Sequence, residues 1–296
     1  MWPSSRMRWR LYVDLLKRSG SAWVADNAPS MGAALAFYSA FSLAPLLIIV
    51  IAIASAAYGQ DAARGAIVTQ LGAVVGESAA QAIQALLKGA QETTTGTIAT
   101  IVSAITMVVG ATTVLVELQD DLDRIWKAPQ REGSGLLAMV RARVLSLGMV
   151  LAIGFLLLVS LVLSGVVAAA GKYWATMFPG AALFLSVANF FLSLAVITFL
   201  IAILYKWLPN VLISWRDVWI GALTTAVLFT IGQIAIGMYL GRSAIASAYG
   251  AAGALVVLLL WLYYSAQIFL LGAEFTHVYA SRRISRPMAG GIASPS

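Results

Sequence analysis

The stretch YGAAGALVVLLLWLYYSAQIFLLGAEF, residues Tyr249–Phe275, decides the class of this protein. Between Ala254 and Leu271 it contains no charged residue, and only Ser265 and Gln267 are clearly polar. An apolar run of this length crosses a hydrocarbon core of about 30 Å as an α-helix. The stretch therefore predicts a transmembrane helix, with a carboxylate, Glu274, near its end.

The composition extends this prediction to the rest of the chain. Of the 296 residues, 61% are hydrophobic and 10% are charged, whereas soluble proteins carry about 25% charged residues. Lipid must therefore solvate much of the surface. The chain has no cysteine and a single histidine, His277. We expect no disulfide, no thiolate nucleophile, no bound metal and no cofactor.

Five further apolar segments precede this stretch, so we predict an all-α protein with six transmembrane helices. The expected spans are residues 31–58, 97–116, 144–170, 181–204, 218–240 and 249–275, within a membrane domain of residues 29–280. A cleaved signal peptide does not explain the first span, because its apolar run exceeds the roughly 7–15 residues of such a segment. Pro45 lies near the middle of that span and predicts a kink.

Three segments lie outside these spans. Residues 1–28 form a basic arm, for which we expect a helix in the headgroup region, with a disordered tail as the alternative. Residues 60–94 place apolar side chains at helical spacing with polar ones between them, which predicts an amphipathic extracytoplasmic segment. Residues 281–296 are expected to be a flexible tail.

The distribution of Lys and Arg predicts the orientation of the spans. With both termini inside, fifteen of the 19 basic residues lie on cytoplasmic segments and four on outer loops. Such a bias is typical of the positive-inside rule, so we predict N-in, C-in topology in a bacterial cytoplasmic membrane. The net charge of +7 is then explained by orientation and anionic lipid, and we expect no nucleic-acid partner.

Five motifs together resemble the YihY/virulence factor BrkB family, bacterial inner-membrane proteins once mislabelled ribonuclease BN. They are ALAFYSAFSLAPLLI (34–48), ELQDDLDRIW (117–126), LPN (208–210), SWRDVWIGAL (214–223) and the opening stretch. The resemblance covers roughly residues 25–280. It implies about six spans and a link to serum resistance, envelope physiology and lipid export, but it supplies no catalytic residues.

Polar residues within the spans are candidates for a pathway, because they are costly in lipid unless they have partners. Tyr-Ser-Ala occurs at residues 38–40 and again at 264–266, and both copies fall in the predicted cytoplasmic half. We therefore expect the first and last spans to face each other around a polar pocket, although three common residues also recur by chance. The candidate residues are Tyr38, Ser39, Pro45, Tyr264, Ser265, Gln267 and Glu274.

Two other sets of polar residues have simpler interpretations. Asn189 and Gln233 are expected to make interhelical contacts. Glu117, Asp120 and Asp121 share one helical face, as magnesium ligands would, but Arg124 and Lys127 stand four residues after Asp120 and Asp123. A solvated helix end with i,i+4 ion pairs is the more ordinary interpretation. His277, one turn after Glu274, could relay protons with it, or the two could simply be an ion pair and a solvated histidine.

The sequence predicts a transporter or a protein that handles lipids or amphiphiles in the cell envelope. Membrane lipids are its expected partners. No nucleotide-binding loop and no charged residue at mid-bilayer occur, which favours amphipathic cargo over an ion. A scaffolding membrane protein that binds envelope partners is the alternative. An enzyme is not expected, because no nucleophile–base pair is evident.

Overall fold

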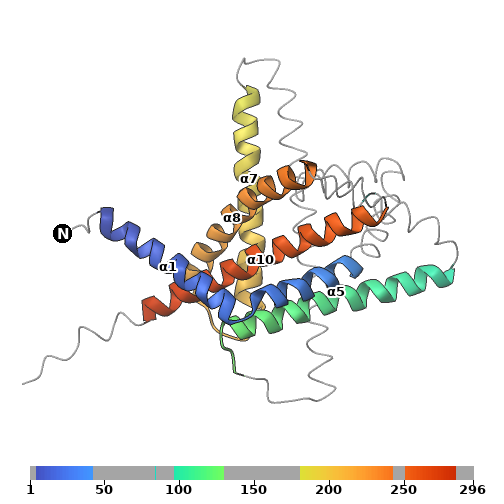
Figure 1. Cartoon of the computed structure of the whole chain (residues 1–296), viewed down its shortest axis with the longest axis horizontal. Coiled ribbons are helices and arrows are strands. Elements are labelled where there is room, and N and C mark those ends of the chain that lie inside the picture. The colour runs from blue at the N-terminus through green and yellow to red at the C-terminus, as the bar shows by residue number, and fades with distance from the viewer. Residues whose placement is uncertain (1–4, 43–83, 85–96, 130–180, 243–250, 285–296) are drawn as a thin grey trace, which may run out of the picture.

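The computed structural model describes residues 5–42, 84, 97–129, 181–242 and 251–284 (Figure 1). The span predicted at 144–170, Pro45, nearly all of the 60–94 segment and residues 285–296 lie outside these ranges. The described ranges contain six helices and no strand, as an all-α class requires. The helices are α1 (Ser5–Ala25), residues 28–42, α5 (Thr97–Ile125), α7 (Ala181–Trp207), α8 (Trp215–Arg242) and α10 (Ala251–Ile284).

Three of these helices are long and apolar enough to cross a membrane. In the described part of the chain, the candidate spans are Val187–Trp207, Trp215–Ile236 and Leu255–Arg282. They correspond to the last three spans expected from the sequence. The predicted span at 97–116 lies within α5. The six-span bundle and its orientation remain predictions.

Local backbone signals explain where the helices end. Asn27 and Lys127 adopt left-handed conformations, with φ of 61° and 51°. At the end of α5, the N–H of Lys127 donates to the carbonyl of Arg124 and that of Ala128 to the carbonyl of Asp123. This pair of bonds is a Schellman cap, and Pro129 follows it as such caps favour. The helices α1 and α5 therefore both end within two residues of a left-handed residue, at the same end of the molecule.

The helices converge at one end, where they bury a common core (Figure 1). We call this the basal core; on the predicted topology it lies on the cytoplasmic side. It joins the helix of residues 28–42 to the C-terminal halves of α5, α7 and α10 and the N-terminal half of α8. Its residues are Ala28, Met31, Leu35, Leu115, Leu118, Leu122, Ile125, Ile201, Ala202, Tyr205, Leu208, Ile213, Val218, Ala222, Ala226, Leu270 and Ala273.

Glycines and hydroxyl side chains bring α8 and α10 close together. A Cβ at Gly221 would lie 1.8 Å from Thr276 Oγ1, and one at Gly272 would lie 1.9 Å from Thr225 Oγ1. Tyr205 of α7 completes this crossing, since its hydroxyl donates to the carbonyl of Phe269 at 2.6 Å. Small residues at a membrane interface permit such an approach, and the hydroxyls hold it.

The helix α10 extends beyond the length that a bilayer requires. Its 34 residues span about 51 Å at 1.5 Å per residue, against a hydrocarbon core of about 30 Å. Its final turns pack against α1, where Asp14 forms ion pairs with Arg18 and Arg282. The basic arm is therefore helical and docked on α10, at least from Ser5 to Ala25.

Candidate functional site

The first and last predicted spans meet at Gln267. Its Nε2 donates to the carbonyls of Ala28 at 3.3 Å and Pro29 at 3.5 Å. A Cβ at Gly32 would lie 2.0 Å from that same nitrogen, so the absence of a side chain there permits the contact. The Oε1 of Gln267 is buried and has no hydrogen-bond partner among the described residues.

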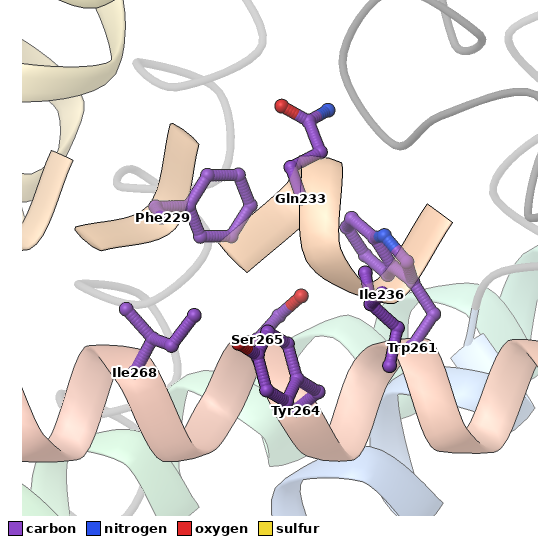
Figure 2. A pocket seen from close by; sticks show the side chains of 7 residues that line it. All are labelled: Phe229, Gln233, Ile236, Trp261, Tyr264, Ser265 and Ile268. Carbon is purple, nitrogen blue, oxygen red and sulfur yellow. The ribbon is translucent and has the colours of Figure 1, made fainter. Parts of the chain in front are cut away.

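The second Tyr-Ser-Ala motif faces α8. Tyr264 and Ser265 line a narrow seam between α10 and α8, and Figure 2 shows Gln233 on α8 with its amide directed away from α10. The seam is too narrow to admit a water molecule. Its remaining lining residues are Phe229, Ile236, Trp261 and Ile268. A pocket that joins Tyr38 and Ser39 to this motif remains a prediction.

The predicted interhelical residues Asn189 and Gln233 differ in their surroundings. Gln233 is half-buried at the seam, whereas Asn189 is exposed on α7. The interhelical contact expected of Asn189 therefore remains a prediction.

Glu274 is fully buried, and within the described ranges neither of its carboxylate oxygens has a hydrogen-bond partner. Asp26, beyond the end of α1, approaches it within hydrogen-bonding reach, and Lys127 is close enough to act on its charge. The same two charged groups act on His277, whose ring lies 5.1 Å from that of Trp126. We refer to Asp26, Lys127, Glu274 and His277 as the Glu274 cluster.

Asp121 is a second buried carboxyl group, with 2% of its surface exposed. Burial, helped by the nearby Glu117 and Asp120 and opposed by Arg124, raises its pKa to about 7. In the described ranges, no three His, Asp or Glu side chains gather as metal ligands, and this includes the carboxylates of α5. Asp121 is therefore a desolvated acid within the basal core.

Asp123 makes a contact that the spacing of the sequence did not predict. Its Oδ1 accepts from the backbone N–H of Asn210 at 2.6 Å, and its Oδ2 accepts from the amide of the same residue. Among the described residues, no ion pair joins Asp123 to Lys127. The left-handed turn at Lys127 has already ended the helix, so the i,i+4 geometry expected there does not form.

Gln119 reinforces the same contact, since its Nε2 donates to the carbonyl of Leu208 at 2.7 Å. The ELQDDLDRIW motif thus docks on the LPN turn. Both motifs are among the five that the sequence analysis singled out, so each was visible separately. Their separation of 87 residues gave no reason to pair Asp123 with Asn210.

We expect Asp123→Ala to lower the free energy of unfolding by about 1–2 kcal/mol, because it removes two charge-assisted hydrogen bonds at an exposed site. Unfolding of the purified protein in detergent would measure this. Asn210→Ala removes only the side-chain bond, so its effect should be smaller. If the double variant loses the sum of the two single effects, the two residues are not coupled.

Comparison with known proteins identifies the family. The family model described as Virulence factor BrkB matches residues 20–291. A UPF0761 membrane protein of Ralstonia nicotianae is 34% identical over 160 residues, 54% of this chain and 34% of that protein. One from Delftia acidovorans is 30% identical over 164 residues, 55% of this chain and 37% of that protein.

A third relative, a UPF0761 membrane protein of Tolumonas auensis, is 35% identical over 91 residues, which is 30% of each chain. The matched stretches therefore span about a third of the length of these relatives. No solved structure matches this chain.

Proposed function

Because the chain belongs to the virulence factor BrkB family of bacterial membrane proteins, we propose that it handles lipids or other amphiphiles at the inner membrane. The observation that carries this proposal is the seam between α8 and α10. There Tyr264 and Ser265 place hydroxyl groups among apolar side chains. An amphiphile needs the same combination, a polar site for its headgroup beside an apolar surface for its chains.

The membrane portions of the helices bounding the seam support this proposal. Exposed apolar side chains along α8 and at the start of α10 include Ile231, Ile234, Met238, Leu255 and Val256. Acyl chains can lie against such surfaces. The seam itself is closed to water, so a headgroup would enter only when α8 and α10 separate along their membrane portions. Their glycine contacts at Gly221 and Gly272 would remain as the fixed end.

Reconstitution into liposomes with a fluorescent phospholipid tests the proposal. We expect the wild-type protein to accelerate movement of the labelled lipid between leaflets. Ser265→Ala should reduce that rate several-fold, because it removes a hydroxyl group that lines the seam. Ser193→Ala is the matched control, since it removes an exposed hydroxyl group from α7 and should leave the rate unchanged.

Absence of lipid movement by the wild-type protein across several headgroups would contradict the proposal. It would favour the alternative, a scaffold that binds envelope partners. One observation supports that alternative: Leu212 is fully exposed on the turn between α7 and α8, flanked by the exposed Trp207 and Trp215. Such an apolar turn suits either the membrane interface or another protein.

A further inference from the structure

We infer that Asp26 and Glu274 form a binding site for one monovalent cation, either a proton or a sodium ion, at the basal end of α10. The site is separate from the seam and does not depend on lipid transport. Its starting point is the state of Glu274, which has no exposed surface and, in the part of the chain that the structure describes, no hydrogen-bond donor on either oxygen. A buried carboxylate is strongly destabilising unless a positive group or a donor compensates it.

Among the residues that the structure describes, the charged groups acting on Glu274 leave the site one positive charge short. Asp26, which follows α1, adds a second carboxylate beside Glu274. Lys127 at the end of α5 supplies one ammonium group, and its side chain is exposed. His277 lies one turn along α10 and counts as neutral in this balance. Two carboxylates opposite one ammonium leave a single negative charge, which a monovalent cation neutralises and a divalent cation exceeds.

The backbone around the site favours the same sign of ligand. Asp26 directly follows the C-terminus of α1, and Trp126 and Lys127 directly follow that of α5. A helix C-terminus carries a partial negative charge of about half an electron. The end of α5 therefore favours a cation near Lys127, whereas at Asp26 the N-terminus of the helix of residues 28–42 offsets the end of α1. Both turns are fixed by the left-handed residues Asn27 and Lys127. Oxygen ligands on rigid helix ends suit a hard cation.

Thermal unfolding of the full chain in lipid nanodiscs tests this inference, with tryptophan fluorescence as the probe because Trp126 lies beside the cluster. In the sodium arm, Na⁺ replaces N-methylglucamine at constant ionic strength. In the proton arm, the pH is lowered without Na⁺, in an Asp121→Asn background that removes the other buried acid. We expect a saturable rise of a few degrees in Tm in one arm, which identifies the cation.

Glu274→Gln and Asp26→Asn should each abolish that rise, whereas Glu117→Gln, which removes a carboxylate from α5 outside the cluster, should retain it. Lys127→Met should enlarge the rise, because it removes the competing ammonium. Because Lys127 is exposed, its replacement should not prevent folding, so Lys127→Met still tests the inference if Glu274→Gln does not fold. A Tm that responds to neither cation, responds only to Mg²⁺, or responds equally in Asp26→Asn would overturn the inference.

Discussion

Gly272→Ala is expected to destabilise the protein by about 3 kcal/mol, at the upper end of the range for an added methyl group in a packed core. The new Cβ would lie 1.9 Å from Thr225 Oγ1 and 2.7 Å from Tyr205 Oη. Neither atom moves easily. Thr225 Oγ1 donates to the carbonyl of Gly221 at 2.8 Å, and Tyr205 donates to Phe269 at 2.6 Å. Relief of the clash therefore breaks a buried hydrogen bond or separates α8 from α10.

Reversible unfolding of the purified protein in detergent would measure this loss. Gly20→Ala is the control, because nothing lies within 4 Å of a Cβ at that position in α1. In a helix interior it should stabilise the protein slightly, by about 0.5–1 kcal/mol. Thr225→Gly should partly restore stability to Gly272→Ala, since it removes the nearest obstructing atoms. Equal stability of Gly272→Ala and wild type would show that the crossing is looser than its distances indicate.

Asp121→Asn should change how stability depends on pH. The pKa of Asp121 is about 7 in the folded protein, against an ordinary value of 3.8. Between these values the folded state binds a proton that the unfolded state has released. The stability of the wild-type protein therefore falls as pH rises from about 4 to 7, and the loss is complete above that window. Asparagine is neutral throughout and does not contribute this loss.

The two proteins should have similar stability near pH 4, and Asp121→Asn should be more stable at pH 8 by on the order of 2–4 kcal/mol. Melting temperatures across this range would show the profiles diverging with rising pH. Asp120→Asn is the control, because Asp120 is exposed on the same turn and its replacement should leave the slope nearly unchanged. Parallel profiles for wild type and Asp121→Asn would contradict the prediction.

The helical class and the last three spans were predictable from sequence, because a long uncharged apolar run has few alternatives in a membrane. The positions at which the helices end were harder to predict from the sequence. The sixth span was expected to end at residue 275, whereas α10 continues to Ile284. The reason is tertiary: α1 packs along this extension, and Asp14 forms an ion pair with Arg282. No pattern local to residues 276–284 reveals that partner.

The candidate site was predictable at single residues but not as a constellation. Gln267 and Glu274 stood out because polar groups in an apolar run are rare. The sequence did not single out Asp26 and offered Lys127 only as an i,i+4 partner of Asp123, and only the convergence of two helix ends brings both to Glu274. Tyr205 was not singled out either, yet it is fully buried with its hydroxyl bonded to α10. Contacts between residues far apart in sequence decide each of these cases.

The glycine crossing at Gly272 also determines how α10 can tilt. About 32 Å of helix precedes this residue from Ala251, and about 18 Å follows it to Ile284. A helix that pivots at that point behaves as a lever with unequal arms. Displacement of the outer end would move the inner end in the opposite direction by about half as much. Because α1 is fastened to the shorter arm, events within the bilayer would reach the N-terminal helix as a smaller, reversed motion.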